Sequence, residues 1–248
     1  MNPSGKTAET WYQRLSDSPT AGSFPSRART AEYREGLYVG YRYCCTAGVR
    51  PAFPFGFGLS YTTFAYSDLR VEPGDTVRGA GARASVVVTN TGPVAGAEVV
   101  QLYVAKPRHE VFRPEQELRA FAKVFLLPGE SRRVTLGLGE PTFRYWNVAT
   151  DAWEVEGGTY ELRVAASSED VRLTGTIELA GTGAPNPYEG LDLAPYETGQ
   201  VAGSRVSDAQ FAALLGRPLP AGRTTIDERM TFRDLTHSRS PLLAAVGA

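Results

Sequence analysis

Seven short strand-like segments, separated by turn signals, occupy residues 64–180 and constrain the fold of this chain more than any other feature. Each segment is apolar, β-branched or alternating in polarity, as is typical of a half-buried strand. Turn-forming PGD, NTG, PGE and EGG sequences stand between them. Seven strands in about 115 residues predict a mainly β fold, an immunoglobulin- or fibronectin III-like sandwich. The segments read FAYSDLRV, RASVVVTNTG, AEVVQLYVA, LRAFAKVFLL, SRRVTLGLG, TYELRVAASS and VRLTGTIELA.

The predicted sandwich lacks the Cys–Trp–Cys pattern of antibody domains, so we expect apolar burial alone to hold its sheets together. VVQLYV (99–104) and KVFLL (123–127) are the expected core strands. The two cysteines of the chain, Cys44 and Cys45, are adjacent. Neighbouring cysteines can bridge only with strain, so we expect two inert free thiols.

The segments on either side of the sandwich are less regular. Residues 1–31 predict loop or extended chain, and the period-2 alternation in 32–45 favours a strand. A short helix beginning near Gly40 is a second interpretation of the same residues. After residue 180, a Pro/Gly-rich connector leads to a helix with a Ser207–Gln210 capping box, and a further short helix is expected over 231–237.

Charge and hydropathy exclude several classes of partner. The chain has 26 Lys plus Arg against 27 Asp plus Glu, a formal net charge of −1. Nucleic acids and acidic membranes require a basic surface excess, so we expect neither as a partner. No apolar run approaches the roughly eighteen residues of a membrane span, and MNPSGKTAET does not have the pattern of a signal peptide. We therefore expect a cytoplasmic protein.

No motif in the chain indicates catalysis. The acidic residues stand in no pocket-like motif, and His109 and His237 have neither metal-ligand spacing nor a nearby nucleophile elbow. The sequence therefore predicts no catalytic residue, no metal site, no cofactor-binding residue and no cofactor. The candidates for a catalytic acid, none of which the sequence singles out, are Glu32, Glu35, Glu98, Glu115, Glu117, Asp151, Glu154 and Glu156.

Aromatic residues mark a hairpin in RYWNVATDAWEVEGGTY (144–160). Trp146 and Trp153 could stack on sugar rings if both were exposed, which would make a carbohydrate-binding module. We favour the structural interpretation, in which the two tryptophans clamp the hairpin by cross-strand contact. Exposed and coplanar rings would favour sugar binding.

The stretch FPFGFGLSYTTF (53–64) could line a ligand site or join two structural units. We interpret it as a docking joint, because Gly56 and Gly58 would let the backbone turn and approach a neighbour closely. The predicted docking residues are Tyr41, Arg42, Phe53, Phe55, Gly56, Gly58 and Tyr61.

Several motifs occur in one order that resembles the C-terminal part of glycoside hydrolase family three, the β-glucosidase family. They are NPSGKTAETW, YREGLYVGYRY, FPFGFGLSYTTF, NTGPVAGAEVVQLYV, RPEQELRAFAKVFLLPGES and WEVEGGTYELRVAASSEDVRL. Together they span most of residues 2–180. The chain departs from the family pattern at Cys44 and Cys45, where relatives tend to carry Tyr and an acidic residue.

The resemblance implies three parts: residues 1–60 as the last strip of an α/β sandwich domain, 61–180 as a fibronectin III-like domain, and 181–248 as a linker with a short helical tail. It also implies that both catalytic carboxylates of the family lie upstream of Met1. We therefore expect a truncated or split β-glucosidase portion that is not catalytic alone and that braces the catalytic domains.

The expected partners are the missing catalytic domains, in cis or from a separate chain, with a second copy of the chain as a further candidate. Carbohydrate would be a partner only of the completed enzyme. The alternative is a stand-alone carbohydrate- or protein-binding module. In a split enzyme, residues 1–60 would present an unmatched apolar surface.

Overall fold

Antiparallel strands make up most of the described chain. The computed structural model describes residues 2–24 and 31–219, together with 242 and 245. Its strands are β1 (Phe64–Glu72), β2 (Ala82–Asn90), β3 (Gly96–Ala105), β4 (Glu117–Leu126), β5 (Ser131–Leu138), β6 (Arg144–Asn147), β7 (Ala152–Val155), β8 (Gly158–Ser167) and β9 (Asp170–Leu179). Its helical segments are η1 (Leu15–Asp17), α1 (Tyr41–Ala47), η2 (Glu140–Thr142), α2 (Ala194–Glu197), η3 (Gly203–Arg205) and α3 (Asp208–Leu215).

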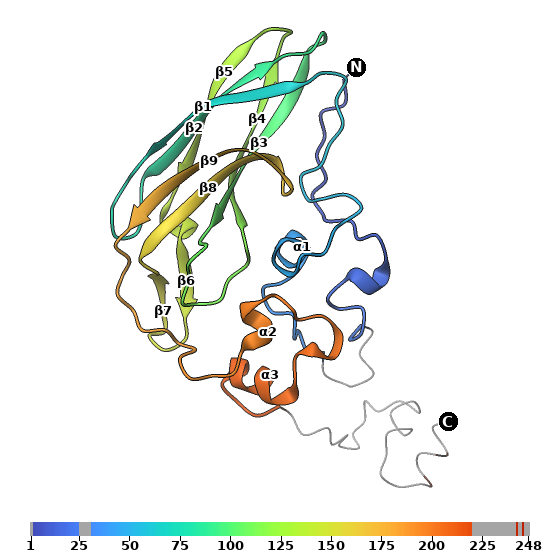
Figure 1. The fold of residues 1–248 in the computed structure, drawn as a ribbon, viewed down its shortest axis with the longest axis vertical. Coiled ribbons are helices and arrows are strands. Elements are labelled where there is room, and N and C mark those ends of the chain that lie inside the picture. Colours follow the sequence, from blue (N-terminus) through green and yellow to red (C-terminus); the bar gives the residue numbers. More distant parts are fainter. Residues whose placement is uncertain (1, 25–30, 220–241, 243–244, 246–248) are drawn as a thin grey trace, which may run out of the picture.

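The seven long strands pair into two sheets, and the two shortest strands form a separate hairpin (Figure 1). One sheet has the order β1-β2-β5 and the other has the order β4-β3-β8-β9. All of these pairings are antiparallel. Two such sheets packed on a common core form a β-sandwich, so the predicted mainly β, fibronectin III-like fold class is confirmed.

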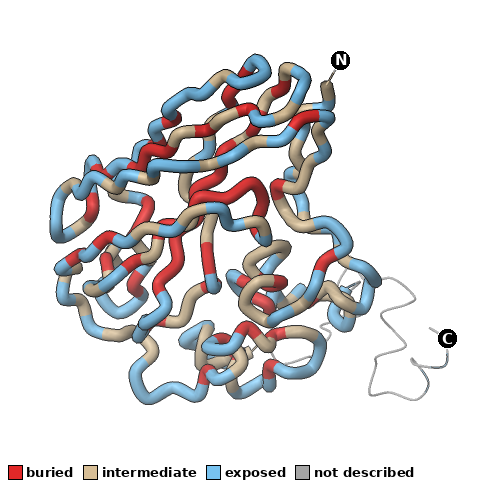
Figure 2. The backbone as a smooth tube through the Cα atoms, turned by 45° about the horizontal axis from the view of Figure 1, so that its top comes forward, coloured by how far each residue is buried: buried red, intermediate tan, exposed pale blue. Residues whose placement is uncertain are grey.

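The sandwich core takes its side chains from the inner face of each sheet. Val86 of β2, Leu102 of β3 and Leu162 of β8 are fully buried and pack in one apolar cluster. The buried backbone follows the central strands of the molecule (Figure 2). Because the described chain has no disulfide, this apolar burial holds the two sheets together, as the sequence predicts.

Only two of the five residues of KVFLL (123–127), at the end of β4, contribute to the core. Val124 and Leu126 are buried, whereas Phe125 and Leu127 are each 56% exposed. Successive side chains of a strand point to opposite faces of its sheet. At this end of β4 the face opposite the core is exposed. The prediction that the whole segment lies in the core was therefore wrong for alternate residues.

A second, smaller apolar cluster joins residues before the sandwich to residues after it. Tyr38 and Tyr43 pack with Tyr196 of α2 and Phe211 of α3. The Tyr38 hydroxyl also donates a hydrogen bond to the Tyr196 carbonyl. The three α-helices therefore lie together beside the end of the sandwich that carries the β6–β7 hairpin (Figure 1). The two flanking segments share one core.

Residues 32–45 do not form the predicted strand. The chain turns over 34–37 and then enters α1, which begins after Gly40 and ends at Gly48. Gly40 has a φ of 56° and Gly48 a φ of 69°, and both values lie in the region that favours glycine. The alternative interpretation, a helix beginning near Gly40, was right, because Gly40, at φ 56° and ψ −132°, turns the backbone out of an extended path.

Helix α3 follows its predicted capping pattern. The Gln210 backbone N–H donates to the Ser207 hydroxyl over 3.2 Å, and the Ser207 backbone N–H donates to the Gln210 side chain over 3.1 Å. Gly216 ends the helix with a φ of 63°. The further helix predicted over 231–237 lies outside the described residues.

Replacing Leu102 with alanine should destabilise the sandwich by about 2–5 kcal/mol, because it opens a cavity in a fully buried site. Urea unfolding followed by circular dichroism would measure the loss. Leu127→Ala is the matched control, since Leu127 is 56% exposed and its truncation should change the unfolding free energy by only about 0.5 kcal/mol. Equal losses in both variants would contradict this account of the core.

Candidate domain-docking interface

The aromatic stretch 53–64 lies between α1 and the edge of the sandwich. The Phe55 ring stands 5.0 Å from the ring of Tyr41 in α1, and Tyr41 lies 5.7 Å from Tyr103 of β3. The carbonyl of Phe55 also accepts a hydrogen bond from the Ser168 backbone N–H over 2.9 Å. This aromatic chain ties the segment before the sandwich to the β3 and β8 side of the four-stranded sheet.

Gln101 fastens the backbone of this segment to the sandwich. Its side chain is 2% exposed and donates to the carbonyls of Gly56 over 3.2 Å and Ala166 over 2.8 Å. It accepts a hydrogen bond from the Tyr103 hydroxyl over 2.6 Å. A buried amide within an apolar run such as VVQLYV is stable only when it is paired in this way.

Two glycines allow the backbone of the 53–64 segment to lie close to its neighbours. Gly56 has a φ of 78°, and a Cβ at this position would overlap the Gln101 side chain. A Cβ at Gly58 would overlap the backbone of Gly5 and the side chain of Lys6. The space beside both glycines is therefore filled by the neighbours they contact.

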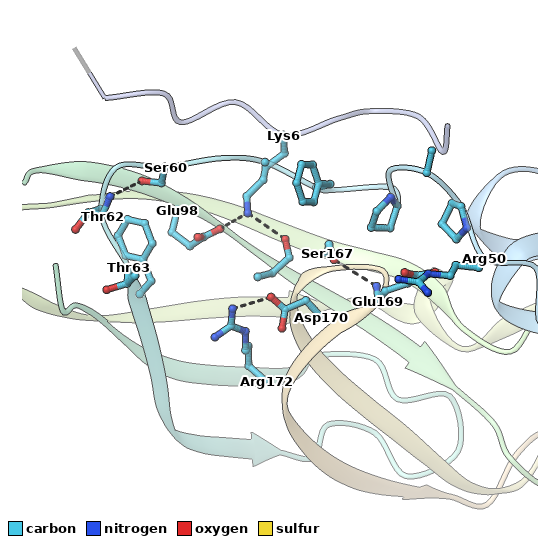
Figure 3. A pocket seen from close by; sticks show the side chains of 17 residues that line it. Lys6, Arg50, Ser60, Thr62, Thr63, Glu98, Ser167, Glu169, Asp170 and Arg172 are labelled. Carbon is cyan, nitrogen blue, oxygen red and sulfur yellow. Dashed lines mark hydrogen bonds and ion pairs between the residues drawn. The ribbon is translucent and has the colours of Figure 1, made fainter. Parts of the chain in front are cut away.

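An ion pair anchors the N-terminal segment to the same region. Lys6 Nζ lies 2.9 Å from a carboxylate oxygen of Glu98 in β3 and donates to the Ala166 carbonyl over 3.1 Å. Figure 3 shows Lys6 reaching from the N-terminal segment toward Glu98 and the sandwich edge. Nearby, Asn2 accepts a hydrogen bond from the Tyr61 backbone N–H over 2.7 Å. Residues 2–6 are therefore held against the sandwich by polar contacts.

Helix α1 is fixed to strand β4 by its own polar contacts. Arg42 pairs with Glu117 at 3.4 Å, and the Tyr41 hydroxyl accepts a hydrogen bond from the Leu118 backbone N–H over 2.8 Å. The Thr46 hydroxyl accepts another from the Glu115 backbone N–H, also over 2.8 Å. The start of β4 and the whole length of α1 are thus joined.

The predicted docking residues divide between two faces of this segment. Tyr41, Arg42, Phe55, Gly56 and Gly58 contact the sandwich or the N-terminal strip, as described above. Phe53 and Tyr61 are instead 45% and 72% exposed. We name the inner contacts the seam, and we name the exposed apolar side chains of residues 11–61 the outer face. The outer face comprises Trp11, Leu15, Phe24, Tyr33, Leu37, Val39, Phe53, Leu59 and Tyr61.

Lys6, Glu98 and Gln101 form the polar half of the seam, which the sequence patterns did not predict. One signal was available for Gln101, because it interrupts the apolar run VVQLYV in a strand expected to be buried. No local pattern pairs Lys6 with Glu98, since the two residues come together only when the N-terminal segment lies along β3.

The two tryptophans of the hairpin face each other across its strands. Trp146 and Trp153 are partners in the β6–β7 register, and their ring centroids are 5.4 Å apart at an interplanar angle of 76°. They are 42% and 46% exposed. Rings so steeply inclined form an edge-to-face pair and offer no flat platform to a sugar ring.

Several acidic residues considered as catalytic acids are held in ion pairs. Glu98 pairs with Lys6, Glu117 with Arg42 and Arg119, and Glu156 with Arg113 and Lys106. Within residues 2–24 and 31–219, no three His, Cys, Asp or Glu side chains are grouped to hold a metal ion. No described helix is long and apolar enough to cross a membrane.

Cys44 and Cys45 are free thiols, and neither is well exposed. Burial raises the pKa of Cys44 to about 12, with Cys45 and Glu169 adding a smaller like-charge effect. Burial also raises the pKa of Cys45 to about 11. At neutral pH both thiols are therefore protonated and weakly nucleophilic.

Proteins of similar sequence and structure identify the family to which this region is related. A family model described as a fibronectin type III-like domain matches residues 98–168. Thermostable β-glucosidase B of Acetivibrio thermocellus is 46% identical over 182 residues, which cover 73% of this chain and 24% of that protein. The crystal structure of a family three β-glucosidase from Bifidobacterium adolescentis matches 100% of this chain and 30% of its own, with 33% identity and a TM-score of 0.71. The chain is homologous to the C-terminal region of family three β-glucosidases.

The matched region is also found in relatives that are named for different activities. An exo-α-(1→6)-L-arabinopyranosidase of Bifidobacterium breve is 42% identical over 190 residues, or 75% of this chain and 24% of that protein. β-Glucosidase 3B of Thermotoga neapolitana, solved with α-D-glucose, is 43% identical with a TM-score of 0.66, over 72% of this chain and 25% of its own. The chain thus spans about a quarter of the length of the curated relatives it matches.

Gly56→Ala should weaken the seam more than a glycine replacement elsewhere, because the new Cβ would displace Gln101 from its hydrogen bonds. The matched control is Gly48→Ala, which also has a positive φ but has open space around it. The control should cost about 1 kcal/mol through backbone strain alone, and Gly56→Ala should cost more. Urea unfolding, together with amide exchange of residues 2–11, would distinguish the Gly56→Ala variant from the Gly48→Ala variant. Equal losses would contradict the role of Gln101.

Neither cysteine should react with an aromatic disulfide reagent at pH 8 until urea unfolds the chain. The folded-state pKa values of about 12 and 11 lie above the ordinary value of 9.0, so the folded chain retains these protons longer. The contribution of the two protonated thiols to the free energy of unfolding is fully present below pH 9 and is lost as the pH rises toward 11–12. Absorbance of the released thiolate would measure reactivity. Fast modification of the folded chain at pH 8 would contradict the burial of these thiols.

Proposed function

We propose that this chain is the non-catalytic C-terminal portion of a β-glucosidase-like enzyme and that it braces the catalytic domains. The whole enzyme would hydrolyse terminal β-linked sugars through a covalent glycosyl intermediate, without a cofactor. The homology to family three β-glucosidases supports this function, as does the full match of the chain to 30% of the Bifidobacterium adolescentis enzyme. The reaction itself is assigned to the portion of such enzymes that lies outside the matched region.

The outer face is the observation that carries the proposal. Trp11, Leu59 and Tyr61 are 58%, 71% and 72% exposed. Leu15 and Phe24 are 84% and 80% exposed in the same part of the chain. Apolar side chains gathered in one segment indicate a surface that another protein unit covers. Catalytic domains, in cis or on a separate chain, are the proposed cover.

The acidic residues of the sandwich support a non-catalytic role. Retaining glycoside hydrolysis needs an acid/base and a nucleophile about 5 Å apart, flanking the scissile bond. Glu98, Glu117 and Glu156 are each held by cationic side chains at 2.5–3.8 Å and serve the packing of the seam and the loops. The proposed contribution of this chain is therefore mechanical.

The division proposed for the chain is residues 1–60 as the docking strip, 61–180 as the brace and 181–248 as the linker and tail. The brace would not select the sugar, because relatives named for β-glucosidase and arabinopyranosidase activities share this region at 46% and 42% identity. Sugar and linkage preference are thus assigned to the catalytic domains.

A domain exchange tests the proposal. The matched region of Acetivibrio thermocellus β-glucosidase B would be deleted, or replaced by this chain, and hydrolysis of 4-nitrophenyl β-D-glucoside would be followed by absorbance. The deletion should be inactive and the chimera active, because the brace restores a covered and ordered catalytic unit. This chain alone should give no hydrolysis above the buffer rate.

Two variants of the chimera localise the contact. Leu59→Asp on the outer face should lower the activity and the melting temperature, because it places a charge in the proposed interface. Phe121→Asp is the matched control, since Phe121 is 67% exposed but lies on β4. A deletion as active and stable as the parent enzyme would refute the bracing role. Turnover by this chain alone, abolished by changing one carboxylate, would refute the non-catalytic assignment.

A further inference from the structure

A cavity of about 540 Å³ lies where the sandwich meets the cluster formed by the three α-helices, which we call the helical cluster. It is separate from the pocket beside Lys6 and Glu98. Its walls come from five parts of the chain: the turn and helix around 36–42, the loop and strand over 111–119, η2, the β6–β7 hairpin, and the segment after β9. A volume of this size suits one small organic ligand. The cavity therefore has the dimensions of a binding site.

Aromatic rings form much of the cavity wall. Phe112 stands 4.8 Å from Tyr188 and 5.6 Å from Tyr196, measured between ring centroids, with interplanar angles of 32° and 31°. The inclined pair Trp146 and Trp153 lines the cavity as well. Such walls favour a ligand that is itself flat and apolar over much of its surface.

The polar part of the wall is dominated by arginines. Arg42, Arg113, Arg119 and Arg144 line the cavity, and Glu117 is the one acidic residue among its described lining residues. Both Arg42 and Arg119 already pair with this carboxylate, at 3.4 Å and 2.5 Å. Arg113 pairs at 2.7 Å with Glu156, which does not line the cavity, so among the described residues Arg144 supplies the unpaired positive charge of the wall.

Several donors around the cavity lack an acceptor. The Nε atoms of Arg42, Arg113 and Arg119 are buried, and none has a hydrogen-bond partner within the described residues. The Tyr196 hydroxyl is also buried without a hydrogen-bond partner among the described residues. Arg144 forms no ion pair within 2–24 and 31–219, and its guanidinium lies 4.5 Å from the Trp153 ring centroid. Buried donors left unpaired are costly, so a ligand that supplies acceptors would stabilise the site.

We propose that this cavity binds a small aromatic carboxylate. Arginine N–H groups donate only, and a carboxylate accepts only, so the two are complementary. The aromatic part of the ligand would pack against the rings of Phe112, Tyr188 and the tryptophan pair. A neutral sugar fits less well, because its hydroxyl groups also need acceptors and the single lining carboxylate is occupied by two arginines.

Calorimetric titration of the full chain with 2-naphthoate tests the proposal. Three comparison compounds separate the contributions: 2-naphthamide keeps the rings without the charge, acetate keeps the charge without the rings, and glucose represents a neutral sugar. We expect saturable binding of 2-naphthoate, with each comparison compound at least about tenfold weaker.

Arg144→Gln should weaken 2-naphthoate binding about tenfold or more, because it removes a charged donor without leaving a described carboxylate unpaired. Arg172→Gln is the matched control: this arginine also lies over an aromatic ring, 5.7 Å from the centroid of Tyr66, but it does not line the cavity. The control should bind 2-naphthoate as the unchanged chain does.

Nuclear magnetic resonance of the tryptophan indole N–H groups in the unchanged chain would locate the bound ligand. Trp146 and Trp153 line the cavity and should shift on titration, whereas Trp11 does not line it and should remain in place. Absence of 2-naphthoate binding at millimolar concentration would overturn the proposal. So would equal affinity for 2-naphthamide, acetate or glucose, an Arg144→Gln variant that binds normally, or a shift confined to Trp11.

Discussion

The buried side chain of Gln101 connects the parts of this structure. It emerges from the apolar run VVQLYV of β3 and binds the backbone of the segment before the sandwich and the chain at the end of β8. Each of these groups would pay a desolvation penalty if it were left unpaired. The position of the aromatic segment on the sandwich therefore follows from the pairing of one amide. Gly56 is required because this amide occupies the space where a side chain would stand.

Once the seam is closed, the remaining surface of residues 11–61 faces outward. The inner side chains, such as Phe55 and Tyr41, find aromatic partners within the chain. The outer ones, such as Leu59 and Tyr61, find none that bury them. A segment that is bound on one side and apolar on the other is suited to lie between two units. This arrangement explains how a sandwich without catalytic groups could serve an enzyme, by holding a docking strip in a fixed orientation.

The helical cluster adds a second level of organisation. Tyr38 and Tyr43 from before the sandwich share a core with Tyr196 and Phe211 from after it. This cluster and the β6–β7 hairpin together line the arginine- and aromatic-rich cavity, which no single segment could form. The tail thus does more than follow the sandwich, since it completes both the small core and the cavity wall.

Much of the fold was determined by the sequence itself. Alternating apolar residues and turn signals located the seven long strands, and the Ser207–Gln210 pair located α3, because these patterns act through neighbours in the chain. The aromatic and glycine pattern of 53–64 also indicated a joint. Other features depended on residues far apart in sequence. The ion pair of Lys6 with Glu98, the shared core of Tyr38 and Tyr196, and the division of the docking residues between an inner and an outer face exist only after the segments meet. Local periodicity states which residues prefer burial, but only tertiary packing decides which partner buries them and which remain uncovered.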